Sequence, residues 1–286
     1  MKGNISNTDF RIVMNVKNIS LKQRKILGGK VNNKVKLQYL SNSGFILTTE
    51  EGKRIIIDPY LTNNPRAPFG PEKIPKIDLV MVTHAAFDHL GDSFYLAKRD
   101  KAHLICDCLV RQLAYTEGLS KEQVKSCSYG GTIERAGISI RVLQAIHVSS
   151  VVDDKGNLSL GLPLAFLITT SKGLRIYHAG DTCLFSDMKL IGQFYRPHIS
   201  LIPVGAAAPQ YGKDLPPREA AQAAQWIGSE FTIPIHYCDS QDPFKFATTV
   251  KILTPWMEVK IMQPGEELIV TLIKQGARTT FILQNS

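Results

Sequence analysis

The feature that most constrains this chain is a polar loop directly after a short apolar segment. Residues 77–82, Ile-Asp-Leu-Val-Met-Val, have the length and composition of a buried strand. The loop that follows places His84, Asp88 and His89 at the end of that strand. Imidazole and carboxylate groups are ligands that Zn²⁺ and Mn²⁺ take in proteins. The chain is therefore expected to build a β-sheet with a metal site at its edge.

The same arrangement recurs later in the sequence. Three more metal-binding side chains each follow a predicted strand, at 138–145, 174–178 and 231–235: His147, Asp181 and His236. Ligands at the same end of neighbouring strands converge on one cleft when two sheets pack face to face. A single strand-end histidine is more often structural, whereas six such side chains favour one functional site.

The order of the predicted elements favours an α/β chain. Meandering strands fill the first third and alternating strands and helices the rest, a pattern typical of sheets sandwiched by helices. Asp58-Pro59 closes one strand, and residues 153–157 are expected to form a turn or flexible flap. We expect further strands at 35–40, 44–48, 54–57, 103–106, 164–169, 199–203 and 258–262, and helices at 93–99, 108–117, 186–195, 217–228 and 243–253.

Composition and cysteine usage favour a cytoplasmic protein. Hydrophobic residues make up 44% of the chain and charged residues 21%, which predicts a sizeable core. No apolar run approaches the roughly 20 residues that cross a bilayer, and the N-terminus lacks the apolar centre of a secretory signal. The five cysteines are odd in number and lack metal-finger spacing, which favours a reducing compartment. We therefore expect a cytoplasmic location and no membrane span.

Positive charge is concentrated at the N-terminus. Residues 1–36 hold nine Lys or Arg and one acidic residue, a net charge of +8, against +1 for the remaining 250 residues. We expect residues 1–34 to form a basic N-terminal extension, with a short helix at 20–27, and residues 35–286 to form the main domain. The extension could contact an anionic partner, but a solvated extension is the simpler interpretation. A charge-neutral main domain is not expected to bind nucleic acid.

Several short motifs, taken together and in order, resemble those of the metallo-β-lactamase superfamily. More narrowly, the chain resembles a branch of metal-dependent hydrolases related to ascorbate-phosphate lactonase. The most specific motif is Ile-Tyr-His-Ala-Gly-Asp-Thr at 176–182, and the others lie at 37–45, 57–62, 88–92, 185–188, 233–237 and 263–266. The resemblance covers roughly residues 35–270 and implies an α/β fold, an αββα sandwich of the metallo-β-lactamase type.

The resemblance also implies a set of metal ligands. In this superfamily, one ion is held by the two histidines of a His-x-His motif and by a later His. A second ion is held by an Asp-His pair and by the last His. A further Asp bridges the two ions. Carried over to this chain, the first site keeps His84, His147 and Asp181 but has Ala86 where its second His would stand. The second site keeps its full set of Asp88, His89, Asp181 and His236. We therefore expect one or two divalent ions, Zn or Mn, with a first site that is vacant or weak.

Roles for the remaining side chains follow from the same resemblance. Asp88 is the expected catalytic residue, which assists the attacking water either as a ligand or as a general base. His84 and His147 are left open as ligands of a weak site, proton shuttles or oxyanion contacts. His178 and Thr182 flank the turn that carries Asp181 and are expected to support the ligands from behind.

Two departures from the family pattern limit what can be carried over. Asn42 stands where relatives often have His in Gly-His-Ser, and the loop 204–209 is rich in Ala where close relatives carry polar residues. The substrate of a relative is therefore not transferred to this chain.

The first functional hypothesis is a metal-dependent hydrolase that uses a metal-activated water on a small ester, lactone, amide or phosphodiester. The alternative is a catalytically lapsed protein of the same fold that binds a ligand or partner, which Ala86 and Asn42 motivate. A nuclease is a weaker third hypothesis, because no large inserted domain is visible. A small-molecule substrate is expected, and a homo-oligomer is left open.

Overall fold

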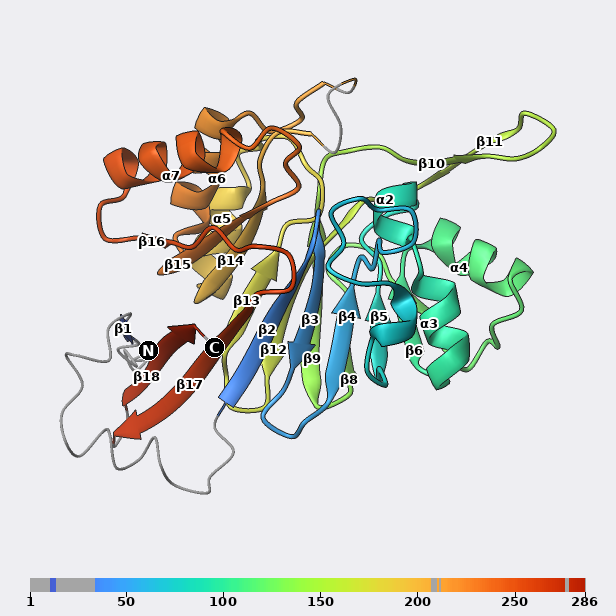
Figure 1. Cartoon of the computed structure of the whole chain (residues 1–286), viewed down its shortest axis with the longest axis horizontal. Helices are drawn as coiled ribbons and strands as arrows, with labels where there is room; N and C mark the ends of the chain where they lie inside the picture. The colour runs from blue at the N-terminus through green and yellow to red at the C-terminus, as the bar shows by residue number, and fades with distance from the viewer. Residues whose placement is uncertain (1–10, 14–33, 207–209, 211, 276–277, 286) are drawn as a thin grey trace, which may run out of the picture.

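The computed structural model describes residues 11–13, 34–206, 210, 212–275 and 278–285, and its core is a pair of facing β-sheets (Figure 1). The first sheet has the strand order β1-β18-β17-β2-β3-β4-β5-β6-β7. Its strands β2, β3 and β4 pair antiparallel, whereas β4, β5, β6 and β7 run parallel. The strand bounds are Arg11–Val13 (β1), Lys34–Ser41 (β2), Gly44–Thr48 (β3), Arg54–Ile57 (β4), Leu79–Met81 (β5), His103–Cys106 (β6), Val124–Ser126 (β7), Glu267–Gln275 (β17) and Arg278–Asn285 (β18).

The second sheet has the strand order β16-β15-β14-β13-β12-β9-β8. Strands β8, β9, β12 and β13 pair antiparallel, and β13 to β16 run parallel. Its bounds are Thr132–Arg135 (β8), Ile138–Gln144 (β9), Leu164–Thr170 (β12), Arg175–His178 (β13), Ile199–Pro203 (β14), Phe231–Ile235 (β15) and Glu258–Val259 (β16).

Side-chain alternation along the strands explains why the sheets stack and helices cover them. Successive residues of a strand point to opposite faces. In β4, Ile55 and Ile57 belong to the core between the two sheets, whereas Ile56 belongs to the core under the helices of the first sheet. In β12, Phe166 faces the central core and Leu167 faces the helices of the second sheet. These central strands are therefore apolar and buried on both faces.

Helices cover the outer face of each sheet (Figure 1). The first sheet is covered by α2 (Phe87–Leu90), α3 (Ser93–Asp100) and α4 (Cys108–Thr116), and the second by α5 (Met188–Tyr195), α6 (Pro217–Ile227) and α7 (Asp242–Leu253). This arrangement confirms the α/β class and the αββα sandwich expected from the sequence. Among the helices that the structure describes, none is long and apolar enough to cross a membrane.

The strand directions bring several chain segments to one edge of the sandwich. Strands β4 and β5 are parallel, so both end at the same edge of the first sheet. In the second sheet β9, β13 and β15 share one direction, because β9 and β13 are each antiparallel to β12 and β15 lies two parallel steps from β13. The loops that follow these five strands therefore supply the side chains of the functional site.

A two-stranded hairpin was predicted only as a turn. Strands β10 (Ser149–Val152) and β11 (Leu158–Gly161) pair antiparallel around residues 153–157 and project from the sandwich (Figure 1). The carboxylate of Asp107 anchors its base by accepting a hydrogen bond from the Leu162 backbone N–H at 2.7 Å. The flap expected from the sequence is therefore the tip of an ordered arm.

The N-terminal division of the chain stays a prediction. Arg11–Val13 forms β1, which pairs in parallel with β18 at the edge of the first sheet. The helix expected at 20–27 lies outside the described residues. Most of the proposed extension, residues 1–34, therefore has no structural description here beyond that one strand and Lys34, the first residue of β2.

Candidate metal centre

Six side chains that the sequence places at strand ends come together in two groups. Asp88, His89 and His236 form one group, and His84, His147 and Asp181 form the other, with the ligand atoms of each group within 4.8 Å of one another. We call Asp88, His89 and His236 the closed half of the centre and His84 and His147 the open half. Asp181 contacts both halves.

In the closed half, donor atoms have the spacing of ligands around one ion. His236 Nε2 lies 3.2 Å from Asp88 Oδ2 and 3.0 Å from Asp181 Oδ2, and His89 Nε2 lies 3.2 Å from Asp181 Oδ2. Ligands about 2.0–2.1 Å from a tetrahedral Zn²⁺ are separated from one another by about 3.3 Å. The four residues are 0–5% exposed, so the site is enclosed.

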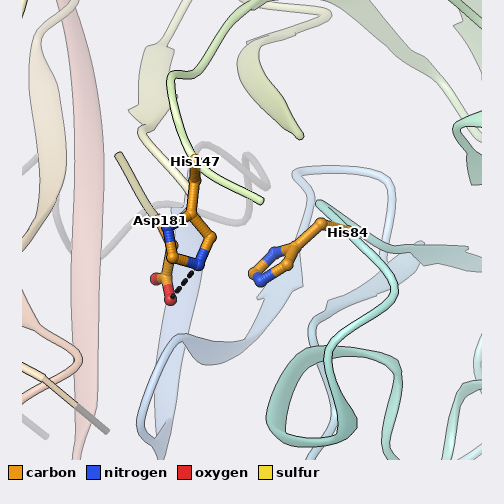
Figure 2. A group of neighbouring side chains, drawn as sticks. All are labelled: His84, His147 and Asp181. Carbon is orange, nitrogen blue, oxygen red and sulfur yellow. Dashed lines mark ion pairs between the residues drawn. The ribbon is translucent and has the colours of Figure 1, made fainter. Parts of the chain in front are cut away.

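The open half is looser and faces solvent. His147 Nε2 lies 3.9 Å from Asp181 Oδ2, and Figure 2 shows the His84 ring directed toward these two side chains. The rings of His84 and His147 are 5.1 Å apart and nearly perpendicular. His147 is half-buried, and its Nδ1 lies 3.7 Å from Oδ2 of the exposed Asp214. Ala86 immediately precedes α2, lines the cavity and offers no ligand atom.

Asp58 supports the closed half from behind, a role that the sequence interpretation missed. Its Oδ2 accepts a hydrogen bond from His89 Nδ1 and another from the Thr83 hydroxyl, both at 2.8 Å, while its Oδ1 accepts from the Thr83 backbone N–H. A carboxylate on Nδ1 fixes the imidazole tautomer and leaves Nε2 bare for a metal. The available signal was that Asp58, like the ligands, directly follows an apolar strand.

Thr83 links the two halves through one hydroxyl group. Its Oγ1 lies 3.1 Å from His84 Nδ1 and 3.0 Å from His89 Nδ1, and it donates to Asp58. Because the hydroxyl proton is given to Asp58, Oγ1 is free to accept from His84 Nδ1–H. The bare nitrogen of His84 is then Nε2, which is buried without a hydrogen-bond partner.

The turn that carries Asp181 is built from tightly packed backbone. Gly180 has a φ of +61°, and a Cβ there would lie 2.7 Å from the Leu164 carbonyl oxygen, so a side chain does not fit. His178 accepts a hydrogen bond from the Gly180 N–H at Nδ1 and therefore donates from Nε2 to the Ser43 carbonyl, at 2.9 Å. Burial lowers the pKa of His178, which keeps it neutral in this role.

Thr182 and Asn42 connect the ligand loops to one another. The Thr182 hydroxyl accepts from the Ile146 N–H at 3.0 Å, which ties the Asp181 turn to the residue before His147. Asn42 Nδ2 lies 3.4 Å from Asp88 Oδ2, and the Asn42 carbonyl accepts from the His236 N–H at 2.9 Å. Asn42 therefore contacts two members of the closed half from the position where relatives often carry His.

Arg66 holds Asn42 from its far side. Its guanidinium donates to Asn42 Oδ1 and to the Tyr237 carbonyl. Three residues around the closed half also adopt left-handed backbone, with φ of +46° at Asn42 and Asp58 and +56° at His236. Such conformations cost energy in residues other than Gly and often mark functional sites.

The charges of the closed half favour a cation. Burial raises the pKa of Asp88, but the hydrogen bond from His236 and the charge of His89 outweigh it and lower that pKa to about 2. Burial lowers the pKa of His236, but Asp181 and Asp88 outweigh it and raise that pKa to about 9. The pKa of Asp181 is held below its ordinary value and that of His89 above it, by the same attraction. The closed half therefore stabilises positive charge at its centre.

The chemistry of the donors fits a divalent metal ion. Carboxylate oxygens and imidazole nitrogens suit Zn²⁺ and Mn²⁺. His84 Nε2, His89 Nε2 and Asp181 Oδ1 are buried and make no hydrogen bond with acceptable geometry, although His89 Nε2 is close to Asp181. Unpaired buried polar atoms are costly, and a metal ion would satisfy them. The ligand role of each side chain stays a prediction.

A cavity of about 910 Å³ opens above the centre. The ligand side chains His84, Asp88, His147, Asp181 and His236 line it, so the centre is accessible from one side. The loop after β14 contributes Ala206, Gly212 and Asp214 to the wall, and β10 of the arm contributes Ser150 and Val151. A volume of this size accommodates a small organic molecule.

Comparisons with known proteins agree with this architecture. Residues 53–237 match the family described as Beta-lactamase superfamily domain. A UPF0173 metal-dependent hydrolase of Methanopyrus kandleri is 36% identical over 236 residues, which cover 81% of this chain and 98% of the relative. A protein of the same name from Rubrobacter xylanophilus is 32% identical over 250 residues, covering 86% and 98%.

A solved structure is similar over the same range. Igni18, described as a novel metallo hydrolase from Ignicoccus hospitalis, is 30% identical with a TM-score of 0.69, covering 82% of this chain and 98% of its own. The comparisons confirm the superfamily, whereas the narrower branch related to ascorbate-phosphate lactonase stays a prediction. The chain belongs to the UPF0173 family of metal-dependent hydrolases, within the metallo-β-lactamase superfamily.

Proposed function

We propose that this chain hydrolyses a small-molecule substrate with one tightly held divalent ion, Zn²⁺ or Mn²⁺, in the closed half of the centre. The observation that carries the proposal is the set of distances of 3.0–3.2 Å among Asp88, His89, Asp181 and His236. Four N and O donors are enough to hold one such ion, which can expand to five-coordinate to take a water or a substrate oxygen. The open half, with Ala86 in place of a ligand, would hold a second ion weakly.

An ion bound there supplies Lewis acidity, which polarises a scissile oxygen and lowers the pKa of water. Asp88 lines the cavity, and its lowered pKa keeps it ionised at neutral pH, so it can accept a proton from an attacking water as well as hold the ion. His84 and His147 line the same cavity as Asp88 and can contact the oxygen on which negative charge develops. His178, Thr182 and Asp58 keep the ligands in position.

The substrate bond belongs to an ester, lactone, amide or phosphodiester, because these are hydrolysed by the chemistry just described. The five cysteines carry no disulfide in the structure, which supports a reducing, cytoplasmic location as part of the proposal.

Metal content and turnover test this proposal together. Protein purified without chelator is assayed by elemental analysis and with p-nitrophenyl acetate and bis(p-nitrophenyl) phosphate. His236→Ala should remove most of the bound metal and lower hydrolysis by at least about 100-fold, since loss of a ligand exceeds the effect of losing a supporting hydrogen bond.

His103→Ala is the matched control, because His103 begins β6 at the opposite end of the parallel strands. It should retain metal and rate. If His236→Ala leaves both unchanged, the proposed function is wrong. Wild-type protein without stoichiometric metal would instead favour the ligand-binding alternative.

A further inference from the structure

The cavity above the metal centre has a largely apolar wall. The apolar lining residues are Phe87 and Leu90 of α2, Phe94 of α3, Leu113 of α4 and Val151 of β10. A substrate group that leaves water for this wall gains free energy in proportion to its apolar surface. The cavity therefore favours a substrate with an aliphatic or aromatic part next to the reacting bond.

The charged groups on the wall are acidic. Besides the ligands, Glu117 at the end of α4 and Asp214 beside His147 line the cavity. Among the described residues that line it, none is Lys or Arg. Phosphate and carboxylate groups are usually recognised by Arg or Lys, and acidic neighbours repel them.

The basic side chains nearest to the wall along the chain are held by other partners. Lys213 lies between two lining residues, but its Nζ binds both carboxylate oxygens of Asp242, at 2.9 and 2.6 Å. Lys98 pairs with the Glu117 carboxylate at 3.0 Å, and the Arg99 guanidinium donates to Asp100 and to the Pro71 carbonyl. An anionic substrate would therefore have to compete with these partners for the cations.

We infer that the substrate is an uncharged ester, lactone or amide with an apolar acyl or alkyl group, and not a phosphorylated or carboxylated compound. This inference rests on the proposed hydrolase function and narrows its substrate class. In the reaction, the water oxygen bonds to the acyl carbon, and the acyl C–O or C–N bond breaks. One proton of the water goes to the leaving oxygen or nitrogen, and the other leaves with solvent as the acid product ionises.

A pair of esters with equal acyl chains tests the inference. p-Nitrophenyl hexanoate and the mono-p-nitrophenyl ester of hexanedioic acid share a six-carbon acyl group and a leaving group, and differ in one terminal carboxylate. The hexanoate should have a kcat/KM at least about 10-fold higher, because an unpaired charge is costly near an apolar wall and acidic groups. Lengthening the acyl group from acetate to hexanoate should raise kcat/KM by up to about 4-fold per methylene.

A matched pair of substitutions tests whether the preference for the uncharged ester arises in the cavity. Thr116 and Gln112 are both exposed on α4, but of the two only Thr116 lines the cavity. Thr116→Lys should shift the kcat/KM ratio of the two esters by about 10-fold towards the carboxylated one. Gln112→Lys adds the same charge outside the cavity and should leave the ratio within about 2-fold. Metal content should be unchanged in both variants.

Binding provides a measurement that does not depend on turnover. Calorimetry with N-hexylacetamide and 6-acetamidohexanoate compares an uncharged with a carboxylated ligand of the same chain length. The uncharged amide should bind more tightly to wild-type protein, and Thr116→Lys should narrow the difference. If neither ester is hydrolysed but this preference holds, the hydrolase proposal fails and the apolar, uncharged ligand class stands.

Two results would overturn the inference. One is a preference for the carboxylated ester or for bis(p-nitrophenyl) phosphate over p-nitrophenyl hexanoate, which would leave the hydrolase function in place. The other is equal or tighter binding of 6-acetamidohexanoate to wild-type protein, whether or not any ester is hydrolysed.

Discussion

The two halves of the metal centre share Asp181 but differ in what lies behind their ligands. In the closed half, His89 is 0% exposed and is held by the buried Asp58, and Asn42 contacts Asp88. In the open half, the His147 side chain is 23% exposed, and its neighbour Asp214 is 44% exposed. A buried partner fixes the orientation of a ligand, whereas an exposed partner competes with water.

This difference shows that the missing ligand at Ala86 is only one of the ways in which the open half differs from the closed half. The open half lacks a ligand and also lacks a buried carboxylate behind His147. His84 is its best-ordered member, because it is 1% exposed and contacts Thr83. Burial lowers the pKa of His84 to about 3, so its side chain is neutral and ready to bind a metal at neutral pH. Affinity in the open half should therefore be limited by His147 and by the missing ligand.

Among substitutions that leave every proposed ligand in place, the largest expected effect comes from removing the support of the closed half. Asp58→Asn puts an amide where the carboxylate accepts from His89 and Thr83, so His89 loses its acceptor and its tautomer is no longer fixed. Asn tolerates the left-handed backbone of Asp58, which has a φ of +46°, so the substitution adds little backbone strain. Metal affinity should fall by about 10–100-fold, measured by competition with a fluorescent chelator.

Asp92→Asn is the matched control for Asp58→Asn. Asp92 is also a buried carboxylate, and it accepts hydrogen bonds from the backbone N–H groups of Leu61 and Thr62 and from the Thr62 hydroxyl. Its loss should lower the free energy of unfolding without lowering metal affinity. Equal metal affinities in the two variants would show that Asp58 supports the fold rather than the closed half.

Restoring a ligand to the open half should produce a smaller change. Ala86 has extended backbone, with φ of −65° and ψ of 147°, and it lines the cavity, so a larger side chain can be accommodated without strain. Ala86→His would give the open half a fourth N or O donor. Bound metal, measured by elemental analysis, should rise from about one to about two ions per chain.

Ala86→Phe separates coordination from packing, since it adds a ring of similar size without a ligand atom. It should leave metal content at the wild-type level. If Ala86→His and Ala86→Phe bind the same amount of metal, the missing ligand does not limit metal binding in the open half. The weakly held side chain of His147 would then be the limiting factor.

Local patterns were sufficient to predict sheets covered by helices and a set of His and Asp side chains at strand ends, whereas the αββα sandwich and the ligand roles came from the family resemblance. The apolar runs at 55–57 and before His84 are visible in a single sequence, because each depends on a few neighbouring residues. Parallel strands end at one edge, so the predicted strand-end residues were also expected to meet. The structure brings them together, as the distances around Asp181 show.

Features that depend on pairing across the fold were missed. Asp58 was interpreted only as the end of a strand. Its contact with His89 depends on the parallel pairing of β4 with β5, which the sequence does not show. Asp214 lies in the loop after β14, and His147 follows β9, so their contact at 3.7 Å joins two separate loops of the second sheet. The arm was missed because Leu158 and Leu160 are 61% and 67% exposed, whereas the sequence rule for strands assumes one buried face.

A buried histidine far from the metal centre shows that burial can lower a histidine pKa in this protein. His198 precedes β14, at the opposite end of the second sheet from Asp181, and is 2% exposed. Its Nδ1 accepts from the Arg175 N–H at 2.9 Å. Burial, with the charge of Arg175, lowers the pKa of His198 to about 3, as burial does for His84. A lowered histidine pKa therefore marks burial in this protein and does not by itself identify a metal ligand.

His198→Asn should alter pH-dependent stability and leave metal content unchanged, because Asn can still accept from Arg175 but does not titrate. An unfolded His has a pKa near 6.5, so between about pH 6.5 and 3 the unfolded chain binds a proton that folded His198 excludes. Wild-type stability therefore falls with acidification, and from pH 7 to 5 this one group contributes a loss of ~2 kcal/mol that the variant lacks. Urea unfolding of both proteins at the two pH values, in the presence of chelator, measures the difference. Identical pH slopes would mean that His198 is protonated in the folded chain, which would weaken the assignment of a neutral, metal-ready His84 on the same grounds of burial.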